Sequence, residues 1–354
     1  MDTSNVSKGI AEFLAETEPF MDQVDNLSLE TAIELYDMLD TLSFSATNNI
    51  RIINPELRVD VCKRQDIVLE RIVDLLPPFE RFSDPVNIYT PAVHNYRRWS
   101  NTELMKDKGL VGYMLAREVG AHPIMYFGTN PPDYPYLHDL PEMELLFDNE
   151  KSGNPETYFN HLFESYSVMD VLVLHGMHDQ TTGYLDAYRQ LRPDGKVFCG
   201  LDMSSYWMSL INWDSLSSKK FAVQCDLLAT SCRTVRDALN INPKVSFPCH
   251  WFPNGFYNPT NANIIADFEV KENIILTVGR IGTAVKNNSE LLAAFAQVSD
   301  ALEGWKVHLV GPIESEFNQF IDAYFSERPD LKSRVIFTGA ITDKDALYKE
   351  YARS

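Results

Sequence analysis

The chain contains 354 residues, of which 45% are hydrophobic and 23% are charged, and this composition is typical of a soluble globular protein large enough for two domains. The formal net charge of −19 and the lack of a basic segment argue against binding to nucleic acid. The sequence has no apolar run of the roughly 18–20 residues that span a bilayer and no signal peptide at its start, so we expect a cytoplasmic protein without a transmembrane segment.

Residues 1–83 predict a helical extension that precedes the first α/β domain. Apolar residues recur at helical spacing in two places, and Pro77-Pro78 ends the region. The first 80 residues carry 16 acidic and 6 basic side chains. Two roles fit this acidic segment equally: contact with an acceptor or partner, and stabilisation of the domain that follows.

Strands and helices alternate through residues 84–256, which predicts a Rossmann-like domain with a parallel sheet covered on both faces. Short apolar runs predict the strands, and amphipathic segments between them predict the helices. The predicted strands are 86–89, 123–127, 171–174, 196–200 and 227–230, and the predicted helices are 101–120, 184–191 and 233–239.

A second Rossmann-like domain is predicted over residues 257–354, after a polar connection. Three strands are few for a domain of this type, so we expect the domain to be incomplete and the chain to be cut short. The predicted strands are 274–278, 306–310 and 334–337, and the predicted helices are 289–302, 317–325 and 345–352.

The first loop of this second domain carries two cationic residues. Arg280 follows the strand 274–278, and Lys286 comes six residues later, before the next helix begins. Ligands bind at the carboxyl ends of parallel strands, and an arginine and a lysine at that edge favour a diphosphate. The alternative is that both are solvated or ion-paired surface residues.

Six short motifs follow one another in the second half of the sequence. They are Phe252-Pro253-Asn254-Gly255-Phe256, Ile274-Ile275-Leu276-Thr277-Val278-Gly279-Arg280, Lys286-Asn287, Leu291-Leu292-Ala293-Ala294-Phe295, Val307-His308-Leu309-Val310-Gly311 and Val335-Ile336-Phe337-Thr338-Gly339. Together they resemble the donor-binding half of the retaining glycosyltransferases of family four, over about residues 250–354. The resemblance implies a GT-B-like fold of two Rossmann-like domains.

By this resemblance, Arg280 and Lys286 bind the diphosphate of a nucleotide sugar. Negative charge grows on the leaving diphosphate as the sugar–phosphate bond breaks, and fixed cations stabilise that charge more in the transition state than in the ground state. In the same family, Pro253-Asn254-Gly255 marks the crossing between the domains, which makes it a structural turn.

The resemblance extends the donor site to the loops after all three strands of the second domain. Glycine follows each strand, at Gly279, Gly311 and Gly339, and permits a positive φ or a close backbone approach to a ligand. Ordinary turn glycines are the alternative, and no Gly-x-Gly-x-x-Gly motif points to a dehydrogenase. The loop that contacts the base in the family corresponds here to Thr338, Gly339, Ala340 and Ile341.

Polar residues also follow two strands of the first domain. His175 and His178 follow the strand 171–174, and Asp202 follows the strand 196–200. At the carboxyl edge these side chains face the cleft, where they fit the hydroxyls of a sugar or an acceptor. Capping of the next helix is the alternative for His175. Many related enzymes have a histidine near the place of Asp202, which leaves its role open.

No metal or other cofactor is predicted. His175 and His178 lack a third ligand, and Asp343 in Asp343-Lys344-Asp345 directly precedes a helix, so we expect it to be the N-cap residue and not part of an Asp-x-Asp metal motif. The cysteines form no Cys-x-x-Cys pair, which favours buried free thiols at Cys62, Cys199, Cys225, Cys232 and Cys249.

The resemblance implies a metal-independent retaining glycosyltransferase of polysaccharide biosynthesis, which moves a sugar from a nucleoside diphosphate sugar to a glycan, glycolipid or protein acceptor. The family's downstream Glu-x7-Glu stretch has no counterpart before residue 354, so we expect an incomplete, inactive site in the chain as it stands. Two alternatives stay open: a catalytically silent GT-B subunit that partners an active transferase, and a nucleotide-sugar epimerase or phosphorylase on the same fold.

Overall fold

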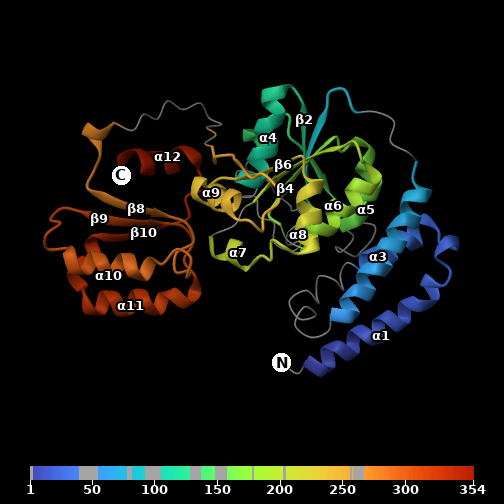
Figure 1. Cartoon of the computed structure of the whole chain (residues 1–354). Coiled ribbons are helices and arrows are strands. Elements are labelled where there is room, and N and C mark those ends of the chain that lie inside the picture. Colours follow the sequence, from blue (N-terminus) through green and yellow to red (C-terminus); the bar gives the residue numbers. More distant parts are fainter. Residues whose placement is uncertain are drawn as a thin grey trace. The chain divides into compact units, whose positions relative to one another are not determined.

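The computed structural model of the protein describes residues 3–39, 55–77, 82–91, 104, 106–127, 137–147, 158–177, 179–201, 205–255, 257 and 267–354. The chain forms two compact units, Met1–Tyr257 and Asn258–Ser354, and each is described by itself (Figure 1). None of the described helices is both long enough and apolar enough to cross a bilayer.

The first unit is built on a seven-stranded parallel sheet in the order β3-β2-β1-β4-β5-β6-β7. The chain adds β2 and β3 on one side of β1 and then returns to place β4 on the other side. This reversal is the point at which open α/β sheets bind ligands, beyond the carboxyl ends of the strands. The strands are β1 (Asn87–Pro91), β2 (His122–Phe127), β3 (Glu144–Phe147), β4 (Val171–His175), β5 (Lys196–Gly200), β6 (Leu227–Thr230) and β7 (His250–Trp251).

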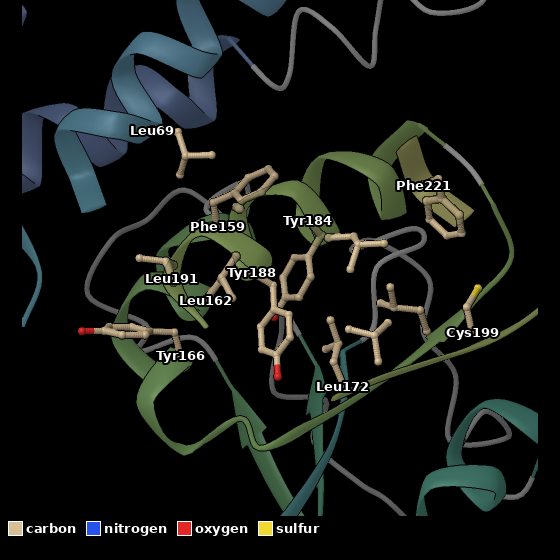
Figure 2. Close-up of a cluster of buried hydrophobic side chains, with 14 of the residues drawn as sticks. Leu69, Phe159, Leu162, Tyr166, Leu172, Tyr184, Tyr188, Leu191, Cys199 and Phe221 are labelled. Atoms are coloured by element: carbon tan, nitrogen blue, oxygen red, sulfur yellow. The ribbon is translucent and has the colours of Figure 1, made fainter. Parts of the chain in front are cut away.

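Helices cover both faces of this sheet because successive strand residues point to opposite faces. Leu172 and Leu174 of β4 join the large apolar cluster that includes α6, whereas Val173 joins a smaller cluster that includes α4. Figure 2 shows Leu172 near Tyr184 and Tyr188 of α6. The helices between the strands are α4 (Asp107–Val119), α5 (Tyr158–Ser165), α6 (Asp179–Leu191), α7 (Ser205–Leu210), α8 (Leu216–Gln224) and α9 (Arg233–Ile241).

The amino-terminal helices share the core of the first sheet. They are α1 (Thr3–Met21), a helix over residues 29–39 and α3 (Pro55–Leu75). Leu69 and Ile72 of α3 are buried in the same cluster as residues of α5 and α6, and Figure 2 shows Leu69 near Phe159 of α5. The ring of Tyr36 meets that of Phe159 edge-on at 4.6 Å between centroids. The acidic segment therefore extends the helical layer of the first unit.

The second unit contains a three-stranded parallel sheet in the order β10-β9-β8. Its strands are β8 (Ile274–Val278), β9 (Lys306–Val310) and β10 (Val335–Gly339). Helices α10 (Asn288–Val298) and α11 (Asn318–Glu327) lie on one side of the sheet, and α12 (Lys344–Arg353) lies on the other (Figure 1). Only the central strand β9 is buried over most of its length, because β8 and β10 are edge strands in the described part of the chain.

Short 3-10 helices connect several of these elements. In the first unit they are Val24–Asn26, Leu137–Asp139 and Tyr166–Val168, and in the second unit they are Phe268–Val270, Ser315–Phe317 and Pro329–Ser333.

The two parallel sheets confirm the predicted α/β fold class. The predicted strands 196–200, 227–230, 274–278 and 306–310 agree with β5, β6, β8 and β9. The predicted helix 184–191 begins five residues earlier, at Asp179. The sequence analysis missed β3, β7, α5, α7 and α8, which are all short.

The prediction of buried free thiols is wrong about burial for two cysteines. Among the cysteines with described side chains, all four are free, but only Cys199 and Cys249 are buried. Cys225 is half-buried, and Cys232 is exposed because it stands at the N-cap of α9, where the chain turns from β6 at the surface. The side chain of Cys62 lies outside the described part of the structure.

Candidate functional site

The side chain of Lys286 lies against the carboxyl end of β8. Residues 279–287 form the loop from β8 to α10, and they bring Lys286 back over Gly279. A Cβ atom at Gly279 would lie 2.8 Å from Cε and 3.3 Å from Nζ of Lys286. The side chain of Lys286 can take this position because Gly279 has no side chain. The ammonium group of Lys286 therefore lies at the edge where parallel sheets bind ligands.

Arg280 lies in the same loop and is exposed. Neither Arg280 nor Lys286 forms an ion pair with any residue in the described part of the chain. By contrast, Arg353 binds Glu272 and Glu350, and Arg328 binds Asp330. The two cations of the loop therefore remain able to bind an anion from solution.

The loops after the three strands of the second unit are joined by backbone hydrogen bonds. The amide of Gly279 donates to Val310 O, and the amide of Gly311 donates to Gly339 O, both at 2.9 Å. A Cβ atom at Gly311 would lie only 1.7 Å from the carbonyl oxygen of Gly279. The close backbone contact therefore explains why glycine stands at position 311, and no ligand is needed to explain it. The role of Gly311 in donor binding stays a prediction.

The loop after β10 lies at the same edge of the sheet. Thr338 is exposed, and its hydroxyl donates to Leu309 O at 3.3 Å and to Gly339 O at 3.0 Å. Gly339 has a φ of 73°, and a Cβ atom there would meet nothing within 4 Å. Ala340 is exposed and Ile341 is half-buried, so the segment predicted to bind the base borders open space.

Asp343 caps α12, as the sequence predicts. Its carboxylate accepts a hydrogen bond from the amide of Ala346 at 2.7 Å. This bond satisfies one of the free amides of the first helical turn. Within the described residues no group of three or more His, Cys, Asp or Glu side chains has the arrangement of a metal site.

His175 lines a small pocket at the carboxyl edge of the first sheet. It is the last residue of β4, is 9% exposed, and lies near Gly200, where a Cβ atom would be 3.7 Å from its Nδ1. The pocket volume is about 30 Å³, which is room for a polar group or a water molecule. Its other lining residues are Val111, Phe198, Gly200, Leu201, Ala229, Thr230, Ser231, Phe252 and Asn254. His178 and Asp202 lie outside the described residues.

The sequence analysis missed the other polar residues that line this pocket. Thr230 is the last residue of β6, Ser231 follows it, and Asn254 comes after β7. Beside them the guanidinium of Arg233 stacks on the ring of Trp251 at 3.8 Å. The signal that could have found them is their place directly after strands, since carboxyl ends of parallel strands meet at one edge.

A comparison with protein families gives one match, which covers residues 272–353 and is described as glycosyl transferases group 1. The matched segment lies within the second unit. The match includes Arg280, Lys286 and the loops after all three strands, and it confirms the resemblance read from the sequence. The first unit lies outside the match.

Solved structures similar to this chain include two of HepE from Anabaena and one of a mutant O-GlcNAc transferase from Thermobaculum terrenum. HepE in complex with UDP and glucose has a TM-score of 0.45 and 12% identity over 72% of this chain and 70% of its own. HepE with UDP has the same score and identity over 74% and 71%. The transferase has a TM-score of 0.40 and 13% identity over 99% of this chain and 61% of its own. No curated protein gave a significant match.

Proposed function

We propose that this protein is a retaining glycosyltransferase that transfers a sugar from a nucleoside diphosphate sugar to a glycan, glycolipid or protein acceptor. One observation carries the proposal. Lys286 is folded over Gly279 at the carboxyl end of β8, in a segment that matches glycosyl transferases group 1. Arg280 lies in the same loop and has no ion pair among the described residues. We further propose that the protein acts in the cytoplasm, in polysaccharide biosynthesis.

The chemistry required of these cations is the stabilisation of a leaving group. As the bond between the sugar and the diphosphate breaks, negative charge accumulates on the diphosphate oxygens. A guanidinium and an ammonium held in place lower the energy of that state without the reorganisation that water needs. In the proposal the reaction proceeds by attack on the face of the sugar that the diphosphate leaves, without a metal.

The pocket around His175 is the proposed contact for the acceptor or the sugar. Imidazole nitrogens, the hydroxyls of Thr230 and Ser231, and the amide of Asn254 are groups that form hydrogen bonds with sugar hydroxyls. His178 and Asp202 stay proposed contacts on the same side. A pocket of this size accommodates one polar group of a ligand and not a whole sugar ring.

A panel of nucleotides tests the donor site. Thermal unfolding of the full chain is followed with UDP, GDP and ADP, and a ligand at 100 times its dissociation constant adds about 2.7 kcal/mol to the stability of the folded state. We expect one of them to stabilise the wild type, and Arg280→Ala and Lys286→Ala to lose most of that effect.

Lys306→Ala is the matched control, because Lys306 is an exposed lysine at the amino end of β9, away from the carboxyl edge. Equal stabilisation of the Lys286→Ala variant and the wild type would remove the basis of the proposal. Transfer of labelled sugar to an acceptor supports a transferase. Binding without transfer points to a silent subunit, and a changed sugar configuration without an acceptor points to an epimerase.

A further inference from the structure

The loop that carries Arg280 and Lys286 is fixed to the rest of the second unit by its first half. Ile281 is fully buried and forms an isolated parallel bridge with Ile313. Its amide donates to Pro312 O at 2.9 Å, and its carbonyl accepts from Glu314 N at 2.9 Å. These contacts fix the backbone next to Arg280, but they do not reach Lys286.

The second half of the loop is a tight turn closed by hydrogen bonds. The amides of Lys286 and Asn287 both donate to Thr283 O, at 3.0 and 3.1 Å. Asn287 has a φ of 46°, a left-handed conformation that asparagine tolerates better than most residues. The turn therefore fixes the backbone of Lys286 two residues before the first residue of α10.

Asn288, the first residue of α10, ties this turn to the helix. Its Oδ1 accepts a hydrogen bond from the amide of Gly282 at 2.8 Å, and its side chain is 1% exposed. Gly282 has a φ of 95°, and a Cβ atom there would lie 2.4 Å from Cβ of Phe317, so its backbone is packed tightly. The bond spans the turn from Gly282 to the start of the helix, and Lys286 lies inside that span.

We propose that Asn288 is a positioning residue for nucleotide binding, which keeps the ammonium of Lys286 on Gly279 by holding the Gly282 end of the turn. This inference rests on the proposed function. Asn288 does not touch the ligand in this scheme, and its effect on binding passes through Lys286. Without this hydrogen bond, the side chain of Lys286 can move away from the edge of the sheet. The anion then binds more weakly, because binding must also return the lysine to that edge.

The chemistry of Asn288 supports a specific role over general packing. Its Nδ2 is buried without a hydrogen-bond partner among the described residues. A buried amide group without a hydrogen-bond partner destabilises the folded state. An apolar residue at the start of α10 avoids that penalty, so packing alone does not favour asparagine, whereas the acceptor for Gly282 does.

A double-mutant cycle on the full chain tests the inference. The dissociation constant of the nucleoside diphosphate that binds best among UDP, GDP and ADP is measured by calorimetry for the wild type, Asn288→Ala, Lys286→Ala and the double variant. We expect Lys286→Ala to weaken binding roughly tenfold or more and Asn288→Ala roughly fivefold. The double variant should bind within about twofold of Lys286→Ala, because residues that act through one another are not additive.

Asn318→Ala is the control, since Asn318 is also the first residue of its helix, but it is exposed and its amide donates to Ser315 O. It should bind like the wild type. Effects of Asn288→Ala and Lys286→Ala that multiply in the double variant overturn the inference, as does unchanged binding in Asn288→Ala. If the wild type binds none of UDP, GDP and ADP, the proposed function fails first and the inference falls with it.

Asn288→Asp is the second variant, for the case that Asn288→Ala does not fold. It keeps an acceptor oxygen for Gly282 in a side chain of nearly the same shape. Binding within about threefold of the wild type supports the role of this hydrogen bond. A folded Asn288→Asp variant that binds as weakly as Lys286→Ala contradicts it.

Discussion

One arginine of the first unit and two cationic residues of the second unit lie in opposite environments. In the first unit, Arg192 and Asp170 form an ion pair at 2.9 Å, and both side chains have no exposed surface. Asp170 also accepts hydrogen bonds from the amides of Ser83 and Asn87, so the pair ties the start of β1 to the end of α6. In the second unit, Arg280 and Lys286 stand at the sheet edge without an ionic partner in the described residues.

This difference is the one expected between a structural ion pair and the binding role that we propose for Arg280 and Lys286. A charge that is buried must find its partners within the protein, since desolvation without a partner is strongly unfavourable. A cation that serves a ligand must leave its hydrogen-bond donors accessible and its counter-charge absent. Substitution of Arg192 should therefore change stability, and substitution of Arg280 or Lys286 should change ligand binding.

The largest expected effect is on the buried pair of the first unit. Arg192→Leu leaves Asp170 as a buried carboxylate without its guanidinium, and we expect the free energy of unfolding to fall by about 3–5 kcal/mol. Urea unfolding of the two proteins measures the change. Lys219→Ala is the control, because its pair with Asp214 is exposed, and it should change stability by less than about 1 kcal/mol.

The reverse pattern is expected for Arg280→Ala. We expect its free energy of unfolding to stay within about 0.5 kcal/mol of the wild type, since the side chain is exposed and has no ion pair to lose. Sugar transfer should lose about 3–4 kcal/mol of transition-state stabilisation, read from kcat/KM. If Arg280→Ala loses stability and keeps its activity, Arg280 has a structural role and the prediction is wrong.

Strand-end glycines give a second contrast between the units. A Cβ atom at Gly311 would lie 1.7 Å from the carbonyl oxygen of Gly279, whereas one at Gly200 would meet its nearest neighbours at 3.7 Å. We expect Gly311→Ala to destabilise the protein by about 3 kcal/mol, because backbone cannot move aside as a side chain can. Gly200→Ala should stay within about 1 kcal/mol. Equal denaturation midpoints for the two variants would contradict this.

A smaller effect is expected from acid, in the first unit. His161 is 6% exposed, stacks on Tyr126 at 3.7 Å and is hydrogen-bonded to Tyr89. Burial lowers the pKa of His161 from 6.5 to about 3, so the imidazole stays neutral in the folded state while the unfolded chain takes up a proton. Stability is therefore lost as pH falls from 6.5 towards 3, by up to about 1.4 kcal/mol per pH unit.

The His161→Gln variant isolates this contribution, because the carboxylates titrate alike in both proteins. Its stability should fall less steeply than that of the wild type between pH 6.5 and pH 4, as measured by urea unfolding at each pH. Parallel pH profiles would mean that His161 is protonated in the folded state as readily as in the unfolded one.

Four strands, two in each unit, were the most predictable part of the fold. The ranges 196–200, 227–230, 274–278 and 306–310 agree with β5, β6, β8 and β9 at both ends, because each apolar run is bounded by polar residues or glycine. The short strands β3 and β7 were missed, since β7 has only two residues and exists through its pairing with β6. A strand of this kind has no local pattern to recognise.

The candidate site also has residues that the sequence predicts and residues that it does not. Arg280 and Lys286 were predictable because both lie in one loop after an evident strand. Asn288 was not, since its importance depends on a hydrogen bond to Gly282 and on burial that no local pattern reveals. The pocket around His175 likewise collects Thr230, Ser231 and Asn254 from separate elements.

The sequence by itself determined the parallel α/β class, the loop that carries the two cations and the cap at Asp343, because these follow from local periodicity, strand-end position and helix-start chemistry. Only the tertiary structure decided that Lys286 folds back over Gly279, that Gly311 makes room for a carbonyl, and that the acidic helices share the core of the first sheet. Those outcomes depend on the packing of residues far apart in the chain, and packing is fixed by the whole set of contacts and not by any one segment.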